Sequence, residues 1–363
     1  MIKKGRDSRN SEVDKRIDIH DVAAEAAVSI ATASRVLNRV STVDPVLKKR
    51  VLAAVDRLGY IPNRQARALV SGRSNLFGVI ISDITNPFFP ELIRGFESRT
   101  VEIGYEVLIG STDYDPAQME LCVQRMLERN VDGVAVMTFG IEAPLLDRLA
   151  AKHIPMVFID VAPRHELATA IKIDYEHGIN EAVQHLAVLG HRKIAFISGP
   201  RTLHSAVARE RAFRRSMTQI GLKVQENYII EGDHTIERGQ QTFAALNKLQ
   251  NPPTAIMCSN DMTAIGVMHG AFDAGLRVPR DLSIIGFDDI HLARHMLPPL
   301  TTVRMSCREL GGAAVDALRS HIAGKEKVIF KNDPLKTSLI VRQTTAIPKG
   351  SLADLRKAPR SRR

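Results

Sequence analysis

The sequence has no tryptophan and only three cysteines, and aromatic residues make up just 5% of its 363 positions. The cysteines, Cys122, Cys258 and Cys307, form no closely spaced pair, and an odd number of thiols cannot all pair within one chain. A disulfide framework is therefore not expected, and free thiols are typical of a reducing compartment. We interpret all three as small apolar core residues, which is the usual role of free cysteine.

Long apolar segments are also missing. No run of 18 apolar residues occurs, and residues 1–16 are charged and lack the apolar core of a signal peptide. We therefore expect no membrane partner and a cytoplasmic location.

Motifs that indicate catalysis or a bound cofactor are absent as well. No G-x-G-x-x-G follows the first expected strand, and G-x-x-x-x-G-K-[ST], G-x-S-x-G and H-E-x-x-H do not occur. His185, His191 and His204 are spaced too irregularly to predict a metal site. The sequence thus favours a protein that is not an enzyme and has no cofactor or metal.

The composition, with 44% hydrophobic and 25% charged residues, is typical of a globular protein, and the length predicts more than one domain. The net charge of +10 is concentrated at the ends of the chain. Residues 1–75 hold 15 basic against 8 acidic residues, and residues 349–363 hold six against one, whereas the segment between them has a net charge of −2. Binding to a polyanion is therefore expected at the ends.

Three short helices are expected after a flexible leader of residues 1–16. They cover roughly residues 19–26, 30–38 and 45–58; Asp44 is the expected N-cap of the third, Pro45 its first residue and Gly59 its end. Seven apolar residues can form an inner face across the first two helices: Val22, Ala23, Ala26, Val28, Ala33, Val36 and Leu37.

That inner face leaves Ile30, Ala31, Ser34 and Arg35 on the outer side of the second helix, where their side chains can enter a groove. Ser29 is the expected N-cap, and the N-terminus of this helix suits a DNA phosphate. The spacing alone also fits an amphipathic hairpin in an unrelated helical domain.

From Leu76 onward, apolar strands alternate with amphipathic helices. Strands are expected at residues 77–82, 106–110, 133–137, 156–160, 171–174, 193–198, 255–258 and 283–287, and helices lie between them, such as 89–103, 116–128, 175–189, 205–221, 236–249 and 261–274. This alternation predicts parallel sheets covered by helices. About ten strands in some 270 residues favour two doubly wound lobes over one large sheet.

The segment from Ile19 to Asn38, IHDVAAEAAVSIATASRVLN, resembles the DNA-binding head of LacI/GalR (lactose-repressor/galactose-repressor) regulators. Four further segments match in the family's order: residues 58–63 (LGYIPN), 83–89 (DITNPFF), 189–196 (LGHRKIAF) and 275–289 (GLRVPRDLSIIGFDD). The resemblance extends from about Ile17 to Ile347 and removes the case for an unrelated hairpin.

The resemblance implies an all-α helix-turn-helix head joined to an α/β body of two doubly wound parallel-sheet lobes, as in periplasmic binding proteins. The implied parts are a leader (1–16), the head (17–60), a hinge helix and linker (61–75), the body (76–347) and a basic tail (348–363). Within the body, the N-lobe covers about 76–174 and 306–332, and the C-lobe about 177–303 and 334–347.

By this resemblance, the second helix lies in the major groove of double-stranded DNA, and positions 30, 31 and 35 read bases. Arg35 can donate two hydrogen bonds to guanine, whereas Ile30 and Ala31 offer only apolar contacts, for instance to a thymine methyl. Ser29, Thr32, Ser34 and Asn38 are placed for phosphate contacts, which position the head without specifying sequence.

The segment from Pro62 to Ser71 resembles the family's hinge helix, which is too short to be stable alone and is expected to order on DNA. Leu69 takes the place of the leucine that family members wedge into the minor groove. Periodicity alone would make Leu69 an ordinary packing residue.

Several candidate ligand-binding residues follow expected strands, where ligands bind in open α/β sheets. By the family pattern, Phe88 and Phe89 form an apolar wall. Polar groups are contributed by Ser205, Arg209, Asn260 and Asp288, and by Asp160 unless it holds its own loop. This combination suits a sugar or sugar derivative. Leu203 stands where purine-binding relatives have an arginine, which argues against a nucleobase.

The resemblance also implies a repressor that acts as a homodimer. Its two copies pair through their bodies and bind a palindromic operator, and an effector changes the angle between the lobes. The expected crossings between lobes are at residues 174–177, 303–306 and 332–334. Repression relieved by the effector is favoured over corepression, and the tail shows no tetramerising heptad pattern. A transport-type sugar-binding protein would share the body but should have a signal peptide and no basic head.

Overall fold

The computed structural model describes residues 17–38, 42–61, 72–138, 143–324 and 333–349. The contacts divide the chain into two compact units, residues 1–74 and 75–363. The predictions for the leader, for the hinge segment with Leu69, and for residues 350–363 of the tail fall outside the described residues.

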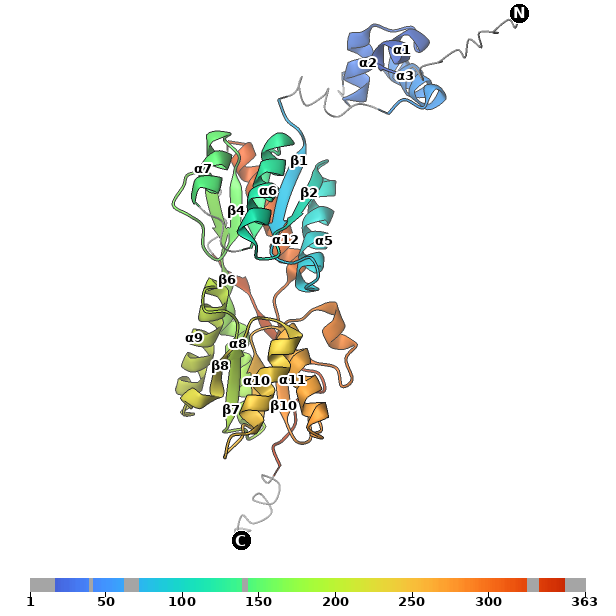
Figure 1. The fold of residues 1–363 in the computed structure, drawn as a ribbon. Coiled ribbons are helices and arrows are strands. Elements are labelled where there is room, and N and C mark those ends of the chain that lie inside the picture. Colours follow the sequence, from blue (N-terminus) through green and yellow to red (C-terminus); the bar gives the residue numbers. More distant parts are fainter. Residues whose placement is uncertain (1–16, 39–41, 62–71, 139–142, 325–332, 350–363) are drawn as a thin grey trace, which may run out of the picture. The chain divides into compact units, whose positions relative to one another are not determined.

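The first unit contains helices α1 (Ile19–Glu25), α2 (Ile30–Leu37) and α3 (Pro45–Leu58) (Figure 1). The helix ends predicted from the sequence are confirmed. Ser29 accepts a hydrogen bond from the backbone N–H of Thr32 at 3.2 Å, and Asp44 caps α3 ahead of Pro45. Gly59 ends α3 with a φ of +59°, in the left-handed region that glycine enters without steric penalty.

The core of the head is made mostly of small residues. Val22 on α1, Ala33 on α2 and Val51 on α3 have no exposed surface, so the three helices pack closely around them. Ala27 lies in the turn between α1 and α2 with a φ of +48°, an unfavourable region for a residue with a Cβ. The Arg50 guanidinium donates a hydrogen bond to the carbonyl of Ala27 at 2.8 Å and so ties α3 to this turn.

The N-lobe has a five-stranded parallel sheet in the order β2-β1-β3-β4-β5. Its strands are β1 (Leu76–Ile81), β2 (Glu106–Ser111), β3 (Gly133–Met137), β4 (Met156–Ile159) and β5 (Ala168–Ile171), and its helices are α5 (Phe88–Glu102), α6 (Pro116–Glu128), α7 (Ala143–Ala151) and α12 (Cys307–Ile322). Alternate residues of β1 point to opposite faces. Phe77 and Val79 pack with α5 and α12, and Ile80 packs with α6 and α7. The continuous apolar run of β1 is therefore buried on both sides.

The C-lobe has a six-stranded sheet in the order β13-β11-β10-β9-β7-β8. Its strands are β7 (Ile194–Ser198), β8 (Ile229–Glu231), β9 (Ala255–Cys258), β10 (Ser283–Asp288), β11 (Thr301–Arg304) and β13 (Ser338–Ile340), and its helices are α8 (Tyr175–Val188), α9 (His204–Gln219), α10 (Ile236–Asn247) and α11 (Asp261–Asp273). Glycines let α10 and α11 approach closely, since a Cβ on Gly266 would lie 2.0 Å from the carbonyl oxygen of Ile236.

Two details differ from the sequence prediction. Strand β13 is antiparallel to β11, so the C-lobe sheet is not wholly parallel, because the chain returns from the N-lobe to its edge in the opposite direction. The strand expected at 171–174 is split into β5, which belongs to the N-lobe sheet, and β6 (Ile173–Asp174), which pairs with β12 (Leu335–Lys336). The short β6–β12 pair thus joins two of the segments that connect the lobes (Figure 1).

In the part of the chain that the structure describes, no helix is long and apolar enough to cross a membrane.

Candidate nucleic-acid interface and ligand pocket

Helix α2 presents the outer face that the sequence predicted. Ile30 is 45% exposed, and Ala31 and Arg35 are also exposed, whereas Ala33 and Val36 are buried. The accessible surface of α2 therefore combines two apolar side chains with one guanidinium. This set can make apolar contacts and donate a bidentate hydrogen bond in a major groove.

At each end of α2, two polar side chains form a hydrogen bond with each other. The hydroxyls of Ser29 and Thr32 lie 2.9 Å apart, and the amide of Asn38 donates to the hydroxyl of Ser34 at 3.3 Å. These hydroxyls stay at the surface, at the helix N-terminus and along its flank. Their proposed phosphate contacts and the base contacts of Arg35 remain predictions.

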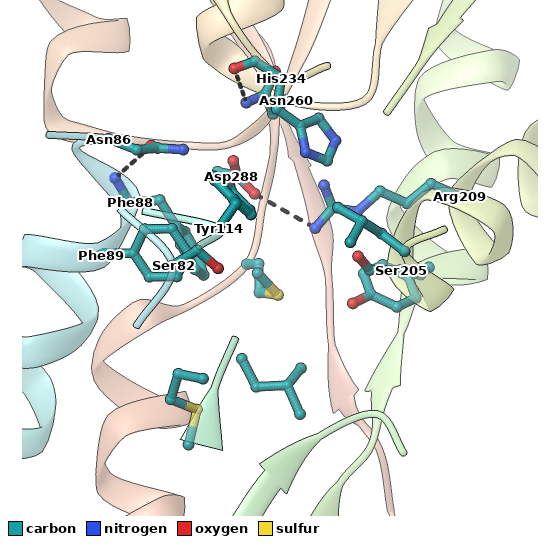
Figure 2. Close-up of a pocket in the computed structure, with 15 residues that line it drawn as sticks. Ser82, Asn86, Phe88, Phe89, Tyr114, Ser205, Arg209, His234, Asn260 and Asp288 are labelled. Atoms are coloured by element: carbon teal, nitrogen blue, oxygen red, sulfur yellow. Dashed lines mark hydrogen bonds and ion pairs between the residues drawn. The ribbon is translucent and has the colours of Figure 1, made fainter. Parts of the chain in front are cut away.

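A pocket lies between the two lobes and encloses about 560 Å³ when its open mouth is included. Residues at the carboxyl ends of strands from both sheets line it, as expected for an open α/β sheet (Figure 2). Its fifteen lining residues are Ser82, Asn86, Phe88, Phe89, Tyr114, Met137, Ile159, Tyr175, Leu203, Ser205, Arg209, His234, Asn260, Asp288 and Met305.

Six of the seven ligand-binding residues predicted from the sequence line this pocket: Phe88, Phe89, Ser205, Arg209, Asn260 and Asp288. The seventh, Asp160, is not among the lining residues. Its carboxylate instead accepts a hydrogen bond of 2.7 Å from the hydroxyl of Tyr175, which does line the pocket. Asp160 therefore holds the side chain of a pocket residue, Tyr175, in place.

The Arg209 guanidinium is buried beside two aromatic rings. It lies 4.0 Å from the ring centre of Phe287 and 5.1 Å from that of Tyr175. One nitrogen donates to the carbonyl of Ser259 at 2.5 Å, and another lies 3.7 Å from the carboxylate of Asp288 (Figure 2). The Nε of Arg209 is buried without a hydrogen-bond partner among the described residues, so the site keeps an unsatisfied donor.

Burial raises the pKa of Asp288 to about 7, although the nearby Arg209 charge lowers it. The carboxyl group therefore changes its charge near neutral pH, because burial disfavours its ionised form. The backbone of Asp288 is also unusual, with a φ of +110°. A residue held in such a conformation depends on its surroundings to keep it there.

The loop that follows Asp288 is held by carboxylates. Asp261, which is fully buried, accepts hydrogen bonds from the backbone N–H of Ile290 at 2.9 Å and from the hydroxyl of Thr302 at 2.5 Å. Asp289 accepts from Arg304 at 2.7 Å and from Arg342. These contacts fix the position of the pocket carboxylate from β11 and from the segment after β13.

Several lining residues were missed at the sequence level. His234 follows β8, a three-residue strand that the apolar pattern did not indicate. Burial and then the Arg209 charge lower the pKa of His234 to about 3, so its ring is uncharged. Tyr175 directly follows the expected strand 171–174, and Ser82 ends the first expected strand. Their positions at strand ends were available signals.

Two family models match the chain: "Bacterial regulatory proteins, lacI family" over residues 18–63 and "Periplasmic binding protein-like domain" over residues 183–345. Among curated proteins, catabolite control protein A of Priestia megaterium is 36% identical over 91% of this chain and 99% of its own length. The chain therefore belongs to the lacI family of bacterial regulatory proteins.

Other members of the lacI family also match this chain over nearly its whole length. The HTH-type transcriptional repressor PurR of Photobacterium profundum is 35% identical over 90% of this chain and 98% of its own length. A lac repressor dimer, solved bound to operator and an anti-inducer, is similar with a TM-score of 0.78 and 31% identity, over 92% of this chain and all of that one. These matches establish a DNA-binding transcription regulator with a helix-turn-helix head and a periplasmic-binding-protein-like body.

Among the described residues, no group of three or more His, Cys, Asp or Glu could hold a metal ion.

Proposed function

We propose that this protein represses transcription by binding a palindromic operator as a homodimer, and that a sugar or sugar derivative in the body pocket releases it. The observation that carries the effector part is the pairing, in one pocket, of the Arg209–Asp288 polar centre with the apolar wall of Phe88 and Phe89. The hydroxyls of a sugar can bond the charged groups while its C–H surface covers the rings.

The pocket lining favours a sugar over a nucleobase. Leu203, at the position where purine-binding relatives have an arginine, is buried and can offer only an apolar contact. Ser82, Tyr114 and Ser205 add hydroxyls, which can both donate and accept hydrogen bonds. Such mixed donors and acceptors match the hydroxyls of a polyol on several sides.

The dimer is supported by exposed apolar side chains on the body. Ile109 lies on β2, the edge strand of the N-lobe sheet, and Val101 and Leu121 lie on the adjoining helices α5 and α6, all at least 46% exposed. Phe272 on α11 is 80% exposed. Clusters of this kind mark protein interfaces. Two heads held by a twofold axis would read two half-sites, which predicts an inverted repeat in the operator.

The proposed switch rests on the placement of the pocket between the two lobes. Residues of both lobes line it, so a ligand contacts the two lobes at once. It can then favour one angle between them by the difference in its affinity for the two arrangements. The start of the body, which follows the head in the chain, belongs to the N-lobe and would move with it.

The test begins with selection of bound sequences from random double-stranded DNA by the full-length protein. We expect enrichment of an inverted repeat, and a gel-shift assay on that operator then measures release by D-glucose, D-galactose, D-ribose and their phosphates. The same compounds are screened by thermal shift, where a binder at 100 times its Kd adds about 2.7 kcal/mol of stability.

The matched variants lie on one helix. Arg209→Ala should abolish the response to the active compound while operator binding persists, and Arg211→Ala, at an exposed position, should leave both unchanged. Enrichment of a sequence without an inverted repeat would contradict the proposal. So would the finding that none of the sugars or sugar phosphates changes operator binding or thermal stability.

A further inference from the structure

We propose that Glu91 is a positioning residue of the pocket: it ties the C-lobe loop that carries Asp288 to helix α5 of the N-lobe, and so links the effector-contacting carboxyl to the arrangement of the lobes. The inference rests on the proposed role of the pocket as the effector site.

The observation is a hydrogen bond between residues 200 positions apart. The carboxylate of Glu91, in the first turn of α5, accepts from the backbone N–H of His291 at 2.5 Å. His291 begins the short helix η2 (His291–Arg294), three residues after Asp288. Since α5 belongs to the N-lobe and η2 to the C-lobe, this bond joins the two lobes.

The loop between Asp288 and His291 is bonded from both lobes. Asp261 holds the N–H of Ile290 from within the C-lobe, and Glu91 holds the next N–H from the N-lobe. On the other side of Glu91, α5 begins with Phe88 and Phe89, the apolar wall of the pocket. One side chain therefore fixes the distance between the wall and the loop that bears the carboxyl.

Glu91 also acts on Asp288 through its charge. Burial is the main cause of the raised pKa of Asp288, Arg209 lowers it, and the negative charge of Glu91 raises it further. The titratable groups that face Asp288 are Arg209 from α9, Glu91 from α5, Asp261 from α11 and the thiol of Cys307 from α12. Removing the charge of Glu91 should therefore favour the ionised form of Asp288.

An ordinary explanation for Glu91 is its position, because an acidic residue in the first turn of a helix stabilises the helix dipole. Glu91→Asp separates the two roles. The shorter side chain keeps a negative charge at the N-terminus of α5 but cannot reach His291. Glu91→Ala removes both the charge and the bond, and Glu97→Gln, at an exposed position on the same helix, is the control.

The experiment measures hydrogen–deuterium exchange in the full-length protein without effector or DNA. In both Glu91→Asp and Glu91→Ala, we expect the N–H of His291 to exchange about fivefold faster, as loss of one exposed charge-assisted bond predicts, while the N–H of Ile290 keeps its rate. Glu97→Gln should match the native protein. Equal exchange at His291 in the native protein and Glu91→Ala would overturn the proposal.

A second measurement tests the electrostatic link, because a purely structural role of Glu91 would not change it. The pH midpoint of Asp288 ionisation, followed by carboxyl carbon NMR, should fall in Glu91→Gln and stay unchanged in Glu97→Gln. An unchanged midpoint in Glu91→Gln would also overturn the link to the carboxyl. Neither readout requires a bound sugar, so a failed sugar screen would count against the proposed function and leave this inference standing.

Discussion

Replacing Asp288 with asparagine should make the protein less sensitive to alkaline pH, because the native carboxyl is costly to ionise in the folded state. Its pKa is about 7 in the folded protein against an ordinary value of 3.8, a difference of about three pH units. At 1.36 kcal/mol for each unit, ionisation of this one group lowers the free energy of unfolding by about 4 kcal/mol.

The sign follows from the direction of the shift. Well below pH 3.8 the carboxyl is neutral in both the folded and the unfolded chain, so it has no effect. As the pH rises through 3.8 towards 7, the unfolded chain ionises first and the stability falls; well above 7 the loss is complete. Between pH 5.0 and 8.5 about 3 kcal/mol of this loss is expressed.

Urea unfolding followed by circular dichroism, without DNA or effector, measures this effect. The free energy of unfolding of Asp288→Asn minus that of the native protein should increase by about 3 kcal/mol from pH 5.0 to 8.5. Asp273→Asn, at an exposed position on α11, is the control. A difference that stays the same at both pH values would refute the reasoning, since it would mean that burial does not disfavour the Asp288 carboxylate.

Arg35→Ala should lose discrimination of about 1 to 3 kcal/mol at one guanine of each half-site while salt-sensitive non-specific binding persists; unchanged preference at every operator base in a competition gel shift would refute the base contact. Ala27→Gly should raise the thermal stability of the head by up to about 1 kcal/mol, since it relieves the φ of +48°, and Ala53→Gly, at an exposed position within α3, should lower it by about 1 kcal/mol. Both effects are read by calorimetry, and a loss of stability in Ala27→Gly would contradict the strain. Gly266→Ala should lower the free energy of unfolding of the body by about 1 to 3 kcal/mol by forcing α10 and α11 apart, whereas Gly312→Ala on α12, where a Cβ meets nothing within 4 Å, should not lower it. Equal stabilities of these two variants in urea would show that the helices can adjust.

The features of the head that could be predicted from the sequence are local. Ser29 caps α2 through a residue three positions away, Pro45 and Asp44 start α3 together, and Gly59 ends it. Each depends on hydrogen bonds or backbone preferences within one turn of chain, which the sequence states directly. The positions of Phe88 and Asp288 near strand ends, and of Arg209 on a helix, were reached through the family pattern as well, and the structure brings all three into one pocket.

The sequence by itself determined the helix ends of the head, the alternation of strands and helices in the body, and the charge of its ends, because those depend on neighbours in the chain. Only the tertiary structure decided that Asp160 bonds Tyr175, that His234, three residues after the short strand β8, lines the pocket, and that Glu91 meets His291 across the lobes. Such contacts depend on where distant segments are placed by the packing of whole sheets and helices. The pKa of Asp288 belongs to the same class, since burial by residues from several elements, and not its place in the chain, makes its carboxyl titrate near neutral pH.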